Sequence, residues 1–265
     1  MLLARLPDRT AGVATKSSAT DLVLAADRAA EDAIAAILRR EFPDDGIVGE
    51  EGASAESRSG RRWFVDPLDG TINYFYGIPH WAVAIACEDV DGLRVGVVCD
   101  GSRNELFAAA RGGGAAVGRA NLADRWIGRL TGRSGFEEYH DQATAIATTV
   151  CSDLSQALLA TGFAYTASSR AEQARILSGV LPVVRDLRRF GSAQLDLAYV
   201  AAGRYDGYFE SVDKPWDWKA GALLVREAGG RVSELPQARP GQPHIVASGP
   251  ALHDDLVSLL RRATS

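Results

Sequence analysis

The segment Trp-Phe-Val-Asp-Pro-Leu-Asp-Gly-Thr, residues 63–71, carries two carboxylates three positions apart, Asp66 and Asp69. An apolar run typical of a buried strand ends at Asp66, and the proline that follows fixes its own φ in the turn. Both carboxylates can therefore converge on one hard cation. If a helix begins at Gly70 and Thr71, their backbone N–H groups are available to an anionic oxygen. Metal ligands beside a phosphate-binding turn indicate metal-assisted phosphoryl transfer or hydrolysis.

Further acids lie at the ends of the elements that precede this segment. Asp27 falls in or near the first turn of a predicted Ala-rich amphipathic helix, and Glu50 and Glu51 follow a short predicted strand. The plainer interpretations are that Asp27 complements the helix dipole and that the paired acids are solvated surface. The alternative is that they face the same site as Asp66. The Ser-, Gly- and Arg-rich residues 53–61 predict a mobile, exposed loop.

The middle of the chain predicts an antiparallel meander. Strand-like segments cover residues 81–87, 93–99 and 105–110. Gly112–Gly114 resembles a phosphate-binding loop in composition but lacks the GxxxxGK[ST] pattern, so we interpret it as a hairpin turn. Residues 115–147 show no clear periodicity.

The chain changes to an α/β pattern from residue 151. Glu210 ends a short strand-like segment, and Asp217 lies in the first turn of a predicted helix. Their plainer interpretations are an ordinary strand-end acid and a helix cap. The helices are predicted at 152–161, 171–180, 191–203, 215–230 and 252–262, and the strands at 183–189, 205–210 and 244–248.

Composition limits the class of protein. The 265 residues suffice for one large domain or two packed lobes, and 46% hydrophobic with 24% charged residues argues against disorder. The net charge of −5 disfavours general binding to nucleic acid or anionic membranes. Three cysteines without CxxC spacing, and no signal peptide or membrane-length apolar run, favour a cytoplasmic protein with reduced thiols.

Taken in order, these motifs resemble the inositol monophosphatase family of Mg²⁺-dependent, lithium-sensitive phosphatases. The resemblance is carried by Gly-Glu-Glu at 49–51, the segment at 63–75 and Trp-Asp-Trp-Lys-Ala-Gly at 216–221, and covers about residues 14–115 and 150–260. It implies an α/β (α+β) fold, a layered αβαβα sandwich. It also implies one phosphatase domain, residues 1–265, with a metal-motif lobe at 1–147 and a substrate-side α/β lobe at 148–265.

The resemblance also implies a set of magnesium ligands. Glu50, Asp66 and the backbone carbonyl of Leu68 would hold a first Mg²⁺, and Asp66, Asp69 and Asp217 would hold a second. Glu50 would help to bind a weaker third ion. Oxygen ligands are those that Mg²⁺ prefers, and one carboxylate shared by two ions suits a two-metal hydrolase.

By the same resemblance, Thr71 with Asp27 would help to deprotonate a metal-bound water that attacks phosphorus in line, with Glu50 among the catalytic residues. Glu210 would hydrogen-bond a hydroxyl of the leaving group, which favours an uncharged, hydroxyl-rich alcohol. The implied substrate-binding residues are Asp69, Gly70, Thr71, Gly191, Ser192, Ala193, Glu210 and Asp217. A phosphate ester is thus the expected small-molecule partner, and a homodimer without nucleic acid or membrane is the expected state.

Three departures from the family pattern stand out. The helix that usually precedes Lys16 is nearly absent, and residues 116–147 do not match the usual short connection. Lys219 stands where a small residue is usual, so we consider either a structural charge or a contact to a second phosphate. The alternatives are a histidinol-phosphate or fructose-1,6-bisphosphate phosphatase on the same core. From a different class, a protein- or RNA-docking role stays open.

Overall fold

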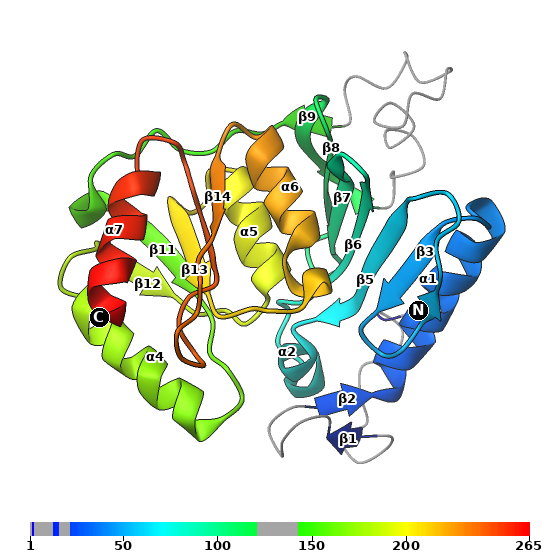
Figure 1. Cartoon of the computed structure of the whole chain (residues 1–265), viewed down its shortest axis with the longest axis horizontal. Coiled ribbons are helices and arrows are strands. Elements are labelled where there is room, and N and C mark those ends of the chain that lie inside the picture. The colour runs from blue at the N-terminus through cyan, green and yellow to red at the C-terminus, as the bar shows by residue number, and fades with distance from the viewer. Residues whose placement is uncertain (1, 3–12, 16–21, 121–142) are drawn as a thin grey trace.

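Five layers of secondary structure make up the protein in this computed structural model, which describes residues 2, 13–15, 22–120 and 143–265. Figure 1 shows an outer helix, an eight-stranded sheet, a central helix pair, a five-stranded sheet and a second outer helix pair. The predicted αβαβα sandwich is confirmed. In layer order the helices are α1 (Ala25–Glu41), α5 (Ala193–Ala201) with α6 (Lys219–Glu227), and α4 (Ala167–Val180) with α7 (His253–Thr264).

The eight-stranded sheet has the order β10-β9-β8-β7-β6-β5-β3-β4, and all its pairs are antiparallel except β3 with β5. The predicted meander is confirmed, and Gly112–Gly114 does turn between β8 and β9. Residues 53–61, predicted as loop only, contain a short edge strand. The strands are β3 (Gly46–Gly49), β4 (Ser54–Ala55), β5 (Arg62–Asp69), β6 (Ala82–Asp89), β7 (Gly92–Asp100), β8 (Glu105–Ala110), β9 (Gly114–Arg119) and β10 (Ala143–Ala145).

The five-stranded sheet has the order β12-β11-β13-β15-β14. The helix predicted at 152–161 is wrong: Asp153 caps a single 3-10 turn, η4 (Leu154–Gln156), and a strand follows at once. That strand lies between two parallel neighbours, so its short apolar run is buried as a sheet rather than as a helix. The strands are β11 (Leu158–Thr161), β12 (Asp186–Arg188), β13 (Gly207–Glu210), β14 (Arg231–Glu234), which was not predicted, and β15 (Ile245–Ser248).

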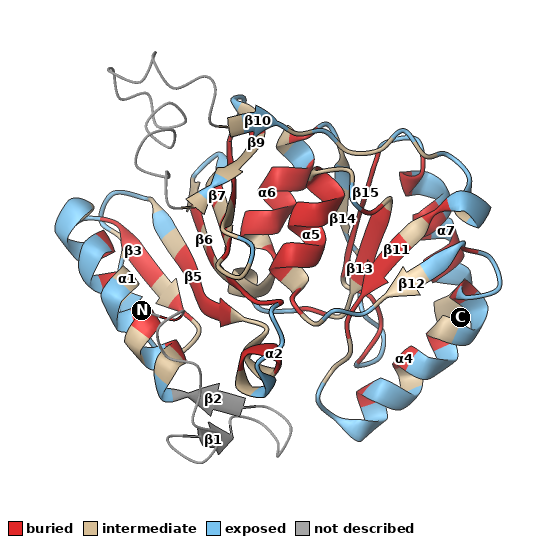
Figure 2. Ribbon diagram, turned by 180° about the vertical axis from the view of Figure 1, so that it is seen from behind, coloured by how far each residue is buried: buried red, intermediate tan, exposed pale blue. Residues whose placement is uncertain are grey.

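The central helices form the middle of the core. Figure 2 shows α5 and α6 almost entirely in the buried colour, because each is covered by a sheet and by the other helix. A Cβ on Gly221 would lie 2.4 Å from the Cβ of Leu197, so glycine lets the two helices approach closely. This packing fixes the start of α6 against the start of α5.

The helix predicted at 215–230 begins differently in the structure. Residues 215–217 form a 3-10 turn, η5 (Pro215–Asp217), and Trp218 leaves the helical conformation before α6 starts at Lys219. Asp217 therefore precedes α6 and is not in its first turn. No helix within the described residues is long and apolar enough to cross a membrane. The lobe boundaries at 147 and 148 stay a prediction, and the Lys16 region and residues 121–142 lie outside the described residues.

Candidate active site

A bulge at the end of β5 positions the two acids with which the sequence analysis began. Asp66 pairs with Ala84 and Asp69 with Ala82, so β5 has one more residue here than β6. The proline between the acids lacks an N–H and is tolerated at such an irregularity. Gly70 then adopts φ 89° and opens α2 (Thr71–Tyr76). The chain thus presents two carboxylates and a turn at one point of the sheet.

Asp66 lies at the centre of the acidic cluster. It is 2% exposed, and its Oδ1 accepts a hydrogen bond from the Leu68 N–H at 3.0 Å. Burial and the charges of Glu50, Asp69 and Asp217 raise its pKa well above the ordinary value. The structure therefore brings together four predicted metal ligands from three separate segments of the sequence.

The donor set of this cluster fits a hard divalent cation. The carboxylates of Glu50, Asp69 and Asp217 lie close to the buried carboxylate of Asp66. A bound cation would offset the repulsion among these negative charges. The side chains are neighbours without forming a finished coordination shell. Within the described parts of the chain, no three or more His, Cys, Asp or Glu side chains meet the geometry of a metal site.

Asp69 connects the end of β5 to the start of α5 in the central helix layer. Its Oδ2 accepts hydrogen bonds from the Ser192 hydroxyl at 2.6 Å and from the Gln194 N–H at 2.7 Å, at the start of α5. Burial raises the pKa of Asp69 to about 6, although the two hydrogen bonds and a further one from the Ala193 N–H oppose this shift. Asp69 therefore lies next to residues 191–193, as predicted.

Gln194 fixes the turn that carries Asp217, and the sequence analysis missed it. Its amide donates to the carbonyl of Trp216 and accepts from the Gly221 N–H at 2.8 Å. The side chain is fully buried on an otherwise apolar helix face. The glutamine within this apolar helix could have indicated such a role, because a buried side-chain amide needs hydrogen-bond partners.

Thr71 and Asp27 lie in contact with each other, as predicted. The Thr71 Oγ1 lies 3.3 Å from Asp27 Oδ1 and 2.9 Å from the Leu68 carbonyl oxygen. Asp27 is 1% exposed, so it is not only a surface complement to the helix dipole. Both groups lie beside the bulge that carries Asp66.

Glu31, one helical turn after Asp27, supports the turn after Glu50. Its carboxylate accepts hydrogen bonds from the N–H groups of Glu51 at 2.8 Å and Ala53 at 2.6 Å. Glu31 was not among the predicted site residues. Two acids four positions apart on the buried face of α1 were the signal for it.

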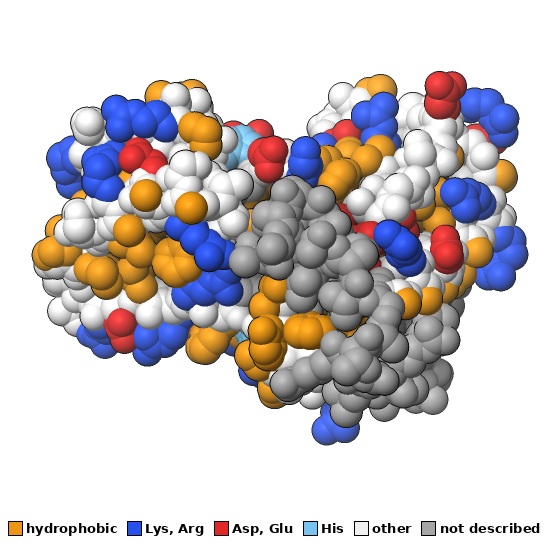
Figure 3. Space-filling view, turned by 90° about the horizontal axis from the view of Figure 1, so that it is seen from below, with side chains coloured by type: hydrophobic (Ala, Val, Ile, Leu, Met, Phe, Trp, Pro, Cys, Tyr) orange, Lys and Arg blue, Asp and Glu red, His pale blue; other side chains and the backbone are white. Residues whose placement is uncertain are grey.

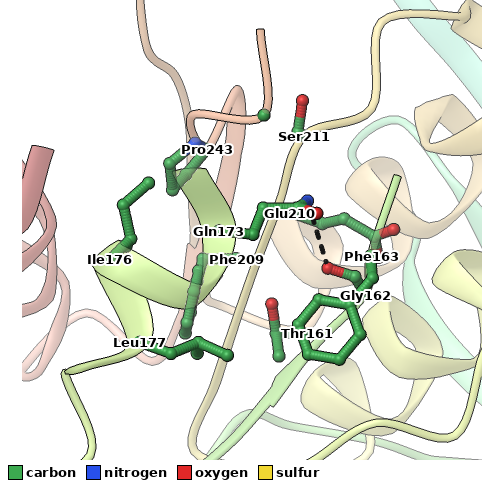
Figure 4. Close-up of a pocket in the computed structure, with 11 residues that line it drawn as sticks. Thr161, Gly162, Phe163, Gln173, Ile176, Leu177, Phe209, Glu210, Ser211 and Pro243 are labelled. Carbon is green, nitrogen blue, oxygen red and sulfur yellow. Dashed lines mark hydrogen bonds between the residues drawn. The ribbon is translucent and has the colours of Figure 1, made fainter. Parts of the chain in front are cut away.

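Glu210 lies at the end of β13, on the side of the five-stranded sheet. The Tyr208 hydroxyl donates to its Oε2 at 2.9 Å, and a Cβ on Gly162 would fall 2.0 Å from its Oε1. Burial raises the pKa of Glu210 to about 7, opposed by the Tyr208 hydrogen bond and the charge of Arg189. Figure 4 shows Glu210 and Phe163 among the residues that line a small pocket.

Asn73 holds the loop before α5 against α2. Its side-chain amide donates to the carbonyls of His80 at 2.8 Å and Phe190 at 2.6 Å. Gly191 follows with φ 87°, a conformation that side chains other than glycine rarely adopt. Asn73 belongs to the 63–75 motif, but no local pattern indicates that it bridges the two halves of the site.

Comparison with known proteins decides the family. The model of the inositol monophosphatase family matches residues 1–265. The chain belongs to the inositol monophosphatase family. It is 39% identical to an inositol-1-monophosphatase SuhB from Mycobacterium tuberculosis, over 98% of this chain and 85% of that protein. It is also 42% identical to the Nus factor SuhB of Pseudomonas aeruginosa, over 88% of this chain and 80% of that protein.

Solved structures agree with this family assignment. The extragenic suppressor protein suhB from Bartonella henselae superposes with a TM-score of 0.81 at 33% identity, covering 98% of this chain and 93% of that one. The Thermotoga maritima IMPase superposes with a TM-score of 0.77 at 27% identity, covering 99% and 91%. The inositol monophosphatase fold therefore extends over the described chain.

Within this fold, Lys219 has a structural contact. Its ammonium pairs with Glu88 and lies 4.0 Å from the centroid of the Phe64 ring. Glu88 faces Arg62 in the sheet register, at the opposite end of β6 from the partner of Asp69. These contacts favour the structural interpretation of Lys219 and leave a second-phosphate contact without support.

Proposed function

We propose that this member of the inositol monophosphatase family is a Mg²⁺-dependent phosphomonoesterase. Its substrates would be inositol monophosphate or related sugar and polyol phosphates. The observation that carries the proposal is the cluster of carboxylates around the buried Asp66, placed beside the Gly70–Thr71 turn. Membership of a phosphatase family and a set of carboxylate oxygens suited to Mg²⁺ both support metal-assisted phosphate hydrolysis.

In this proposal, two to three Mg²⁺ ions are held by side-chain oxygens and one backbone carbonyl. When bound, they supply charge stabilisation for the transferred phosphoryl group and a nucleophilic water at neutral pH. The proposed ligands are Glu50, Asp66, the carbonyl of Leu68, Asp69 and Asp217.

Thr71 would orient the attacking water. Its hydroxyl has one proton and two acceptor neighbours, the Leu68 carbonyl and the Asp27 carboxylate. When the hydroxyl donates to Asp27, a lone pair of Oγ1 remains to accept a hydrogen bond from water. Asp27 can then receive the proton through Thr71. The pair thus provides general-base assistance without a strongly basic side chain.

The substrate would lie next to the start of α5, between the end of β5 and the end of β13. The N–H groups of Gly70 and Thr71 would hold phosphoryl oxygens, and Glu210 would accept a hydrogen bond from a hydroxyl of the alcohol. The short segment Gly191, Ser192 and Ala193 would complete the wall next to Asp69. Histidinol phosphate and fructose 1,6-bisphosphate remain alternative substrates, because only the contacts to the alcohol separate them from inositol monophosphate.

The test is phosphate release from a panel of esters with and without Mg²⁺, each also with lithium. The panel includes inositol 1-phosphate, fructose 1,6-bisphosphate, histidinol phosphate and 4-nitrophenyl phosphate. We expect release only with Mg²⁺ and fastest from a sugar or polyol phosphate. Absence of Mg²⁺-dependent release from every ester would overturn the proposal.

A second candidate function is docking to a transcription complex. It is favoured by one observation, the 42% identity to a protein named Nus factor SuhB. The net charge of −5 makes independent RNA binding the less favourable form of this role. The test is co-elution of the purified chain with Nus factors of the same organism. No co-elution would contradict the docking role, and the elution volume alone tests the predicted homodimer.

A further inference from the structure

The turn that carries Glu50 connects β3 with β4, the short strand at the edge of the eight-stranded sheet. One hydrogen bond closes this turn, from the Gly49 N–H to the Ala53 carbonyl at 2.8 Å. The Glu50 N–H donates to the carbonyl of Val65 at 3.2 Å, and Val65 directly precedes Asp66. A proposed metal ligand on such a turn needs further support, because loops position side chains less precisely than helices or strands do.

Glu31 supplies this support from α1. Both oxygens of its carboxylate are engaged: Oε2 accepts from the Glu51 N–H at 2.8 Å, and Oε1 accepts from the Ala53 N–H at 2.6 Å. A Cβ on Gly49 would lie 2.4 Å from Oε2 of Glu31. The carboxylate therefore lies directly against the backbone of the turn, on both sides of its tip.

The surroundings of Glu31 differ from those of an ordinary surface acid. On the face shown in Figure 3, most acidic side chains lie beside Lys or Arg. Glu31 is 3% exposed, and the groups that donate to it are backbone N–H groups. The other side chains on the buried face of α1 include Ala30, Ala35 and Leu38. Because a buried carboxylate is costly unless its hydrogen bonds are made, Glu31 indicates a task at the turn and not in helix packing.

We propose that Glu31 is a positioning residue that holds Glu50 in place to bind Mg²⁺. This inference rests on the metal site of the proposed function. Both oxygens of Glu31 already accept from the turn, so it orients a ligand and is not one itself. Asp27 lies one helical turn earlier on the same buried face and contacts Thr71. The helix α1 would thus align a metal ligand and the hydroxyl that orients water.

The experiment compares the wild type with Glu31→Gln and Glu41→Gln. Glutamine has nearly the shape of glutamate, but its NH₂ group would face a backbone N–H, so one of the two hydrogen bonds is lost. We expect Glu31→Gln to raise the Mg²⁺ concentration for half-maximal phosphate release about 10- to 100-fold, and excess Mg²⁺ to restore most of the turnover. Titration calorimetry with MgCl₂ alone should show a similar weakening. Glu41, exposed at the end of α1, is the matched control and should behave as the wild type.

A second variant, Gly49→Ala, disturbs the same contact from the side of the turn. Its Cβ would displace the Glu31 carboxylate, so the Mg²⁺ requirement should rise here as well. Thermal unfolding in EDTA checks that each variant stays folded.

An unchanged Mg²⁺ requirement in folded Glu31→Gln would overturn the inference, and if that variant unfolds, Gly49→Ala decides in the same way. A loss of turnover that excess Mg²⁺ does not restore would also overturn it, since that is the result of a merely structural role. If no ester is cleaved but Glu31→Gln binds Mg²⁺ more weakly than the wild type, the inference stands and the proposed function fails. No binding of Mg²⁺ by the wild type would overturn both.

Discussion

The side of the candidate site on the eight-stranded sheet is built mainly from one continuous segment, whereas the side on the five-stranded sheet is assembled from separate ones. Asp66, Leu68 and Asp69 follow each other at the end of β5. Glu210 ends β13, and Arg189 follows β12, with about twenty residues between them. A continuous segment can be detected as a motif, but an assembled surface becomes visible only in the fold.

The two sides also differ in charge. Burial and the neighbouring carboxylates raise the pKa values of Asp66 and Asp217, which fits a cation site. On the other side, the positive charge of Arg189 opposes the burial that raises the pKa of Glu210. We infer that the first side performs chemistry common to many phosphate esters and that the second distinguishes among the alcohols. The following predictions test this division.

The largest effect should come from Asp66→Asn. We expect turnover of every ester to fall below detection, because the shared ligand of the proposed metal site is lost. Phosphate release and circular dichroism measure activity and folding. The matched control is Asp255→Asn on the exposed face of α7, which should keep full activity. Near-wild-type activity of the Asp66 variant would refute the metal assignment.

Gln194→Ala should weaken the connection between the sides. The carbonyl of Trp216 and the N–H of Gly221 would lose a buried partner. We expect the free energy of unfolding to fall by about 1–3 kcal/mol, as urea titration can measure. The control is the exposed Gln156→Ala, which should change little. Equal stability of both variants would show that Gln194 does not hold the Asp217 turn.

Glu210→Gln should alter selectivity more than chemistry. We expect kcat/KM for inositol 1-phosphate to fall by about tenfold, because a charged hydrogen-bond acceptor for the alcohol becomes neutral. Hydrolysis of 4-nitrophenyl phosphate, whose leaving group lacks such a hydroxyl, should be nearly unchanged. Equal losses on both esters would exclude Glu210 as a contact to the leaving group.

The smallest effect should appear in the pH dependence of stability. Burial raises the pKa of Glu210 from 4.5 to about 7, so between these values the folded chain binds more protons than the unfolded chain. Stability contributed by this group should therefore decrease as pH rises from about 4.5 to 7. We expect Glu210→Gln to remove a decrease on the order of 1 kcal/mol, measured by unfolding in EDTA. The exposed Glu56→Gln should leave the decrease in place.

The sequence predicted most elements wherever the hydrophobic pattern is long or bounded by clear turns. The meander and the helices α1 and α5 are examples. It failed at residues 152–161, because a short apolar run suits a buried strand and a helix equally well, and the neighbours β12 and β13 decided between them. It also placed Asp217 inside a helix, although the turn held by Gln194 keeps Asp217 before α6.

A short stretch of sequence was enough to predict metal-assisted phosphate chemistry. Two carboxylates, a proline and a Gly-Thr turn lie within one short segment, and their positions are set by local backbone geometry. Only the tertiary structure showed which distant groups hold or complete this segment, such as Glu31, Asn73 and Gln194. It also gave Lys219 a partner in Glu88 and left Arg189 beside the proposed alcohol site. Such contacts depend on how two sheets pack around a shared helix pair, and no local pattern specifies that arrangement.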